Sequence, residues 1–104
     1  MTADGFDPDA LTHDAFLGGQ VMLHQPRQGY RAGVDAVLLS ASVKAENGAR
    51  VMDLGCGAGA VILCLGARVP GLQLTGVERD PAYAALARRN GGTALEVIQA
   101  DLSA

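Results

Sequence analysis

The most constraining feature of this 104-residue chain is the segment 51–60, which reads Val-Met-Asp-Leu-Gly-Cys-Gly-Ala-Gly-Ala. A short apolar segment with one acid leads directly into a loop that contains Gly55, Gly57 and Gly59. Glycine has no Cβ and adopts positive φ angles easily, so such a loop brings bare backbone close to a ligand. Residues 58–67 predict a helix, whose first N–H groups are unpaired and partially positive. This order of elements favours a nucleotide-like cofactor.

Two classes of cofactor use this geometry, and Asp53 discriminates between them. The spacing Gly55-x-Gly57-x-x-Ala60 also matches the dinucleotide fingerprint, so the glycines alone do not decide. A carboxylate two residues before the loop would repel a pyrophosphate, whereas it would attract a ligand with a cationic end. S-adenosylmethionine (SAM) is such a ligand, because it carries an ammonium and a sulfonium. The alternatives are a dinucleotide oxidoreductase, or an Asp53 that only accepts hydrogen bonds from loop amides.

Two later segments repeat the pattern of a strand that ends at an acid. Residues 72–78 alternate like a strand and end at Glu78, and residues 95–101 predict a third strand that ends at Asp101. The carboxyl ends of parallel strands meet at one edge of a sheet, so we expect both acids to lie near Asp53. An acid at the end of the second strand is placed to accept hydrogen bonds from both hydroxyls of a ribose.

The segments between these strands complete an α/β pattern. Asp80 and Pro81 predict the start of a helix, as an N-cap acceptor followed by proline at the first helical position. The helix continues through residues 82–89, and Asn90-Gly91-Gly92 predicts its end. Residues 49–104 therefore predict a β-α-β-α-β unit with three parallel strands and their helices.

The residues before this unit predict a small lead-in. Within residues 11–48 we expect a hairpin at 15–25, which turns at two adjacent glycines, and a helix at 36–43. Asp35 immediately precedes this helix and is expected to cap it. Residues 1–10 are acidic and polar, with glycine and proline, and predict a mobile tail.

The motifs at the three strand ends resemble those of class I SAM-dependent methyltransferases. They read Asp53-Leu-Gly-Cys-Gly-Ala-Gly59, Gly76-Val-Glu78-Arg-Asp80 and Gln99-Ala-Asp101. The resemblance implies a Rossmann-like domain in which Asp53 and the glycine loop hold the methionine end of SAM, Glu78 binds the ribose and Asp101 accepts from the adenine amino group. The residues expected at the cofactor are Arg31, Asp35, Asp53, Gly55, Cys56, Gly57, Gly59, Glu78, Arg79, Asp101 and Leu102.

The lead-in narrows the resemblance to one group of these enzymes. Residues 16–19, 25–27 and 29–39 look like the corresponding part of the bacterial tRNA (adenine-N6) methyltransferases that act on valine tRNA, within the small-domain methyltransferases. The implied activity is methyl transfer to an adenine amino group in tRNA. Ribosomal RNA and protein-glutamine methylases share the cofactor half, so they remain alternatives. By this resemblance Asp35 faces the cofactor pocket; Arg31 approaches the SAM carboxylate, RNA or only solvent.

One motif of these enzymes does not occur in the chain. Members that methylate a planar nitrogen carry an Asn-Pro-Pro-aromatic tetrapeptide after the fourth strand, and no Asn-Pro pair occurs in these 104 residues. We therefore expect a cofactor-binding half without catalytic residues, inactive alone, or a non-catalytic binding or assembly module. Without a fourth strand, residues 51–54 would form an unpaired apolar edge, which predicts self-association.

The charge, cysteines and histidines of the chain argue against a phosphate-binding surface, a disulfide and a metal site. The formal net charge is −3 and no basic run occurs, so the chain shows no phosphate-binding footprint of its own. Cys56 and Cys64 are roughly 12 Å apart along a helix, too far for a disulfide, and are expected to be free thiols in a reducing compartment. His13 and His24 lack partners at metal-ligand spacing. No signal peptide or membrane-spanning segment is recognisable, so we expect a cytoplasmic location.

Overall fold

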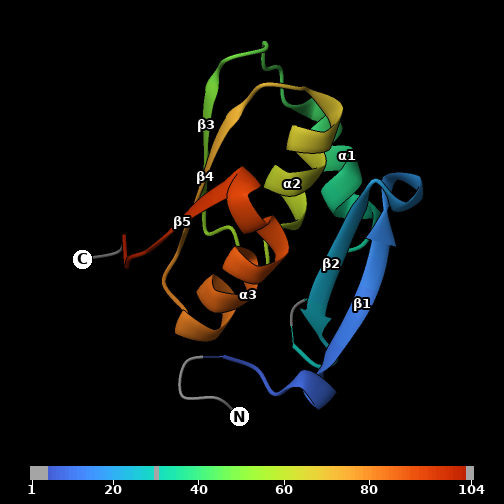
Figure 1. Cartoon of the computed structure of the whole chain (residues 1–104), viewed down its shortest axis with the longest axis vertical. Coiled ribbons are helices and arrows are strands. Elements are labelled where there is room, and N and C mark those ends of the chain that lie inside the picture. The colour runs from blue at the N-terminus through green and yellow to red at the C-terminus, as the bar shows by residue number, and fades with distance from the viewer. Residues whose placement is uncertain (1–4, 30, 103–104) are drawn as a thin grey trace.

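A computed structural model describes residues 5–29 and 31–102 of the chain (Figure 1). It confirms the expected α/β class, with an antiparallel hairpin and a helix ahead of a three-stranded parallel sheet. Three short 3-10 turns, Pro8–Ala10, Leu17–Gly19 and Gly92–Ala94, join these elements. The helices and strands are β1 (Leu11–Phe16), β2 (Val21–Pro26), α1 (Val34–Ser42), β3 (Arg50–Leu54), α2 (Ala60–Arg68), β4 (Gln73–Glu78), α3 (Pro81–Gly91) and β5 (Leu95–Gln99).

The parallel sheet has the strand order β3-β4-β5, with β4 in the centre. Its register pairs Asp53 with Gly76 and Glu78 with Gln99, so the carboxyl ends of all three strands lie along one edge. β3 is the edge strand of this sheet on the side away from β5. Parallel neighbours require crossover connections, and here α2 and α3 provide them.

The helices cover one face of the sheet. Figure 1 shows α1, α2 and α3 on the same side of β3, β4 and β5, and the hairpin β1–β2 on the far side of the helices. Leu74 and Leu95 point from the sheet into this layer, where they pack with Ile62 of α2 and Ala87 of α3. In the described part of the chain no helix covers the opposite face, and β3 exposes Met52 and Leu54 to 58% and 63%.

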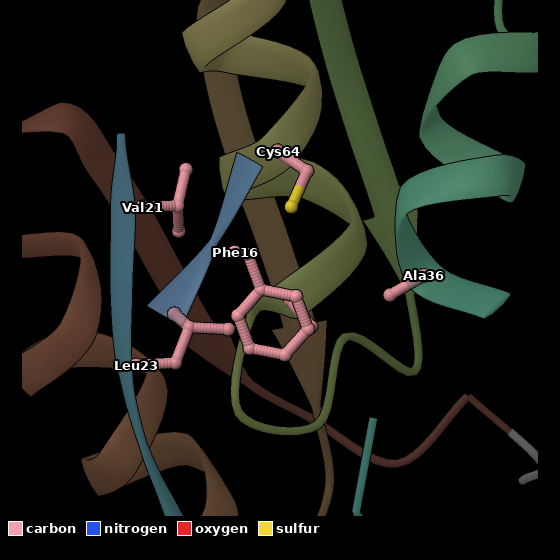
Figure 2. Packing of buried hydrophobic residues seen from close by; sticks show 6 residues of the cluster. Phe16, Val21, Leu23, Ala36 and Cys64 are labelled. Carbon is pink, nitrogen blue, oxygen red and sulfur yellow. The ribbon is translucent and has the colours of Figure 1, made fainter. Parts of the chain in front are cut away.

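A second apolar cluster fixes the hairpin on the helices. Val21 and Leu23 of β2 alternate with the exposed Met22, as expected for a strand with one buried face. Leu23 is fully buried and packs with Phe16 of β1, and Figure 2 shows its side chain directed toward the Phe16 ring, in the same cluster as Cys64 of α2. The hairpin is therefore part of the core rather than a surface extension.

Several boundaries differ from those expected, for local reasons. The helix expected at 36–43 begins at Val34, with Gly33 as its N-cap, so the prediction that Asp35 is the cap was wrong. Asp35 instead lies in the first turn and accepts a 2.8 Å hydrogen bond from the Gly33 N–H. The helix expected from residue 58 begins at Ala60, because Gly59 has the left-handed φ of 96°.

The residues that precede β1 contact the body of the molecule. The Phe6 ring lies edge-to-face on Tyr83 of α3, with ring centroids 5.2 Å apart. The backbone N–H of Arg27 donates to the Ala10 carbonyl at 2.7 Å. Of the tail expected at 1–10, residues 1–4 lie outside the described residues. Within the described ranges, none of the helices combines the length and the apolar character needed to cross a bilayer.

Candidate functional site

The glycine loop between β3 and α2 presents bare backbone to open space. Gly55 and Gly57 have φ angles of 79° and 55°, a region that side-chain-bearing residues rarely adopt. A Cβ placed on either residue would meet no atom within 4 Å, whereas one on Gly59 would lie 3.3 Å from Leu63 Cδ1. Gly55 and Gly57 therefore keep the loop open on its outer side, and Gly59 starts α2.

Backbone amides of the loop are held by the neighbouring strand end. The N–H groups of Gly55 and Cys56 both donate to the Val77 carbonyl, at 2.7 and 3.0 Å. The Gly57 N–H donates to Glu78 Oε1 at 2.9 Å, and Glu78 Oε2 accepts from the Asp80 N–H at 2.9 Å. One carboxylate thus ties the loop to the start of α3.

A cleft of about 460 Å³ lies beside this loop. Its volume falls within the range of about 300–1,000 Å³ that is usual for small-molecule sites. Asp53 and Glu78 line it from the ends of β3 and β4, next to the backbone of Gly55 and Gly57. The lining also includes residues from the lead-in and from α3, namely Gln25, Ala32, Leu39 and Tyr83.

The cleft is electrostatically prepared for a cation. Burial raises the pKa of Asp53, and the neighbouring charge of Glu78 raises it further. Burial also raises the pKa of the Cys56 thiol to about 11, with Asp53 and Glu78 adding to the effect. A positively charged ligand beside these two carboxylates would stabilise the ionised form of Asp53.

Asp101, expected as the third acid of the site, lies in an adjoining hollow of about 310 Å³. β5 ends at Gln99, so Asp101 and Leu102 follow the strand and are exposed. Glu78 and Arg79 line both the cleft and this hollow, so the two spaces share a wall. Asp53, Glu78 and Asp101 therefore lie along one edge of the sheet, with Glu78 between the other two acids.

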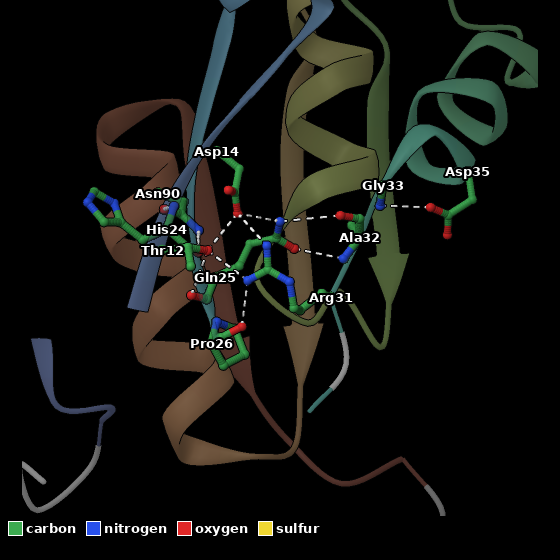
Figure 3. Close-up of polar contacts among 10 residues, drawn as sticks. All are labelled: Thr12, Asp14, His24, Gln25, Pro26, Arg31, Ala32, Gly33, Asp35 and Asn90. Carbon is green, nitrogen blue, oxygen red and sulfur yellow. Dashed lines mark hydrogen bonds and ion pairs between the residues drawn. The ribbon is translucent and has the colours of Figure 1, made fainter. Parts of the chain in front are cut away.

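Arg31 is engaged away from the cleft. Its guanidinium donates to Thr12 Oγ1 at 2.7 Å and to the Pro26 carbonyl at 2.8 Å, and it pairs with Asp14 at 3.1 Å (Figure 3). Although burial alone would raise the pKa of Asp14, bonds from Thr12 and Gln25 and the charge of Arg31 lower it. The lining of the cleft includes Ala32 but neither Arg31 nor Asp35, both of which the sequence placed at the cofactor.

Gln25 is a site residue that sequence reasoning missed. Its side chain is buried, accepts from the Ala32 N–H at 2.7 Å and donates to the Ala32 carbonyl at 3.3 Å and to Asp14 at 2.9 Å (Figure 3). These bonds fix the backbone of Ala32, which lines the cleft. Nothing in the local sequence marks this role, because its partner lies seven residues away across a loop.

A larger hollow of about 1030 Å³ lies elsewhere on the molecule. It is lined by Arg50 and Gln73, the first residues of β3 and β4, and by Met22 of the hairpin. It therefore reaches the amino ends of the strands. Ligands of open parallel α/β sheets bind outside the carboxyl ends, so the smaller cleft at the glycine loop is the candidate site.

Comparison with known proteins assigns the second half of the chain to a domain family. A family model described as a methyltransferase domain matches residues 51–104, which include β3, the glycine loop, β4 and β5. Among solved structures, the fold is similar to a predicted O-methyltransferase, protein Atu636 of Agrobacterium tumefaciens, with 32% identity and a TM-score of 0.60. The match covers 66% of this chain and 37% of that one. YjhP of Escherichia coli, at 22% identity and a TM-score of 0.57, shares the fold.

Curated relatives extend the similarity into the lead-in. The tRNA1(Val) (adenine(37)-N6)-methyltransferases of Yersinia pestis and Yersinia pseudotuberculosis are each 39% identical to this chain over 81 residues. The aligned region covers 77% of this chain and 33% of each relative. The chain thus spans about a third of the length of the curated relatives that it matches.

Proposed function

Because this chain belongs to the methyltransferase domain family, we propose that the cleft beside its glycine loop binds S-adenosyl-L-methionine, the methyl donor that this membership implies. The observation that carries the proposal is the position of Asp53 and Glu78, on neighbouring strand ends, in one cleft with bare loop backbone. A cationic amino acid end would lie between groups of opposite charge, and a nucleoside would lie along the edge toward Asp101.

The acidic side chains of the cleft suit the positive charge of this donor. Asp53 would accept from the ammonium, and Glu78 would accept from the ribose hydroxyls while it keeps the Gly57 N–H. Asp101 and Leu102, which line the adjoining hollow, would contact the adenine. Arg31 is paired with Asp14, so it is not among the residues proposed to contact the cofactor.

Methyl transfer from this donor needs little acid–base assistance from the protein. When bound, SAM supplies a methyl group on a sulfonium, which is already activated for attack by an amine. The contribution that these residues can make is to fix the donor in position, because alignment of reacting groups accounts for a large part of such rates. The described residues would therefore serve as the donor-holding part of a methyltransferase.

The experiment for the cofactor is calorimetric titration of the chain with SAM and with its demethylated product. We expect micromolar binding of both and a loss of at least tenfold in the Asp53→Asn variant. Glu96→Gln is the matched control, because Glu96 is an exposed acid of β5 outside the cleft. Binding of NADH with indifference to SAM would support the dinucleotide alternative and would overturn the proposal.

We propose an adenine amino group of tRNA as the methyl acceptor. The support is the 39% identity to relatives whose names state this reaction, and the alternatives are ribosomal RNA and protein glutamine. A tRNA acceptor also favours a cytoplasmic location.

Labelled SAM offered with unmodified valine tRNA, ribosomal RNA or a release factor tests the acceptor. Label in the tRNA alone would support it, and label only in another acceptor would contradict it. The affinity for SAM, measured in the presence of each acceptor, is a second test, and an increase with tRNA alone would support the proposal.

We also propose that the chain associates with itself through β3. Within the described residues β3 pairs with β4 alone, so its other edge offers free backbone groups. The same strand carries the exposed side chains of Met52 and Leu54. Sedimentation velocity should show a dimer for the unmodified chain and a monomer for the Met52→Lys variant. Met22→Lys is the control, since Met22 is an exposed methionine of the hairpin. A concentration-independent monomer for the unmodified chain would contradict self-association.

A further inference from the structure

Asn90, near the end of α3, joins three segments that are far apart in the sequence. Its Oδ1 accepts from the His24 N–H at 2.8 Å, and its Nδ2 donates to the His24 carbonyl at 2.9 Å. The same Nδ2 donates to the Ala58 carbonyl at 2.9 Å. The side chain thus uses both donors and its acceptor on backbone groups of β2 and of the glycine loop.

The bond to Ala58 acts on the loop that borders the cleft. Ala58 lies between Gly57, whose N–H is held by Glu78, and Gly59, whose N–H donates to the Cys56 carbonyl at 2.9 Å. A peptide unit is planar, so holding the Ala58 carbonyl also sets the direction of the Gly59 N–H. Three glycines allow this loop many backbone conformations, and such a loop needs external bonds to keep one of them.

We propose that Asn90 is a positioning residue for the cofactor. Its bond to the Ala58 carbonyl keeps the glycine loop in the conformation that binds the cofactor. Its two bonds to His24 link this conformation to the packing of the hairpin on α3. The inference rests on the proposed function, because it assigns to that site a residue outside the cleft lining. Gln25, which holds another wall, follows His24 on the same strand, so β2 supports the cleft from two sides.

The energetic basis is the number of groups that one substitution would leave without a partner. Asn90→Ala removes a donor from two carbonyls and an acceptor from one N–H. The Ala58 carbonyl would then lose its bond from Asn90, and the loop would adopt more conformations until a ligand ordered it. That ordering would reduce the affinity. A tenfold loss of affinity corresponds to about 1.4 kcal/mol, which is close to the net contribution of one hydrogen bond.

The test compares Asn90→Ala with Arg89→Ala. Arg89 is the preceding residue of α3, and its partner is the His24 ring, at 3.4 Å, rather than the glycine loop. We expect Asn90→Ala to weaken binding of the demethylated product of SAM about tenfold at a temperature where the variant is folded. Arg89→Ala should change it less than twofold. Equal affinities in the two variants would overturn the proposal.

A second readout is independent of the cofactor. In the free protein, Asn90→Ala should shift the amide resonances of Gly57 and Gly59 and accelerate hydrogen exchange of the Gly59 N–H. A folded variant with unchanged loop amides would overturn the positioning role, even if its melting temperature falls. If the unmodified chain binds neither SAM nor its product, the proposed function fails, and these amide signals still decide the role of Asn90.

If the Asn90→Ala variant does not fold, the hydrogen bonds of Asn90 can be tested by NMR in the unmodified protein. The two Nδ2 protons of Asn90 should exchange slowly and show nuclear Overhauser contacts to Ala58 and to His24. Fast exchange without these contacts would overturn the proposal.

Discussion

Gly76 of β4 lies directly beneath the Cys56 side chain of the glycine loop. A Cβ placed on Gly76 would come within 2.7 Å of Cys56 Sγ and 3.1 Å of Cys56 Cβ. Since Gly76 is opposite Asp53 in the sheet, the space that it leaves lets the loop fold back over the strand ends. The absence of a side chain at this position therefore determines where the loop lies.

Substitution of Gly76 by alanine should displace the loop. We expect Gly76→Ala to cost about 1–3 kcal/mol of unfolding free energy, as overpacking does, and to weaken cofactor binding about tenfold. Urea unfolding and calorimetry measure the two effects. The double variant Gly76→Ala/Cys56→Ala removes the nearest contact and should recover part of both losses, so additive losses would show that the contact is not the cause.

Glu78 should be important for cofactor binding. Glu78→Gln removes the charge that accepts from the Gly57 and Asp80 N–H groups and that is proposed to accept from the ribose hydroxyls. Hydrogen bonds to charged groups contribute about 1.5–3 kcal/mol, so weakening those from the ribose should lower the affinity for SAM tenfold or more. Calorimetry measures the change, and a loss no larger than that of Glu96→Gln would be inconsistent with a direct role.

Asp53 should lower stability at neutral pH. Its pKa is raised in the folded state by burial and by Glu78, so between pH 3.8 and the folded pKa the folded chain binds more protons than the unfolded chain. Stability therefore decreases as pH rises from 3.8 through the folded pKa, and the cost persists above it. Asp53→Asn should raise the melting temperature by a few degrees at pH 7 while it weakens SAM binding. A thermal scan at pH 7 and at pH 3.5 checks this, since the difference should shrink in acid.

The hairpin should contribute substantially to stability through Leu23. Leu23 is fully buried between the hairpin and α2, and truncation of such a leucine costs about 2–5 kcal/mol. Leu23→Ala should therefore lower the free energy of unfolding by this amount, as urea denaturation measures. Met22→Ala, at the neighbouring exposed position, should change it by less than about 0.5 kcal/mol. Similar losses for both would mean that the hairpin is not part of the core.

Much of the second half of the molecule follows from short-range patterns. Asp80 caps α3 as expected, since it accepts from the N–H groups of Ala82 and Tyr83 at 2.8 and 3.3 Å. The three parallel strands and the hairpin are confirmed as well. Strand alternation, proline at a first helical position and glycine at a turn act on residues close in the chain, so the sequence is sufficient to predict them.

The side-chain partners could not be predicted in this way. Arg31 carries a charge suited to a carboxylate, yet it pairs with Asp14, seventeen residues away on a strand that only the fold brings near. Likewise, Asn90 is separated in sequence from its partners His24 and Ala58 by 66 and 32 positions.

The sequence by itself thus determined the order of the elements and the acids at the strand ends. Only the tertiary structure decided which polar groups hold the loop and which face the cleft. The reason is that packing first determines which backbone groups lack a partner, and nearby side chains then bind those groups.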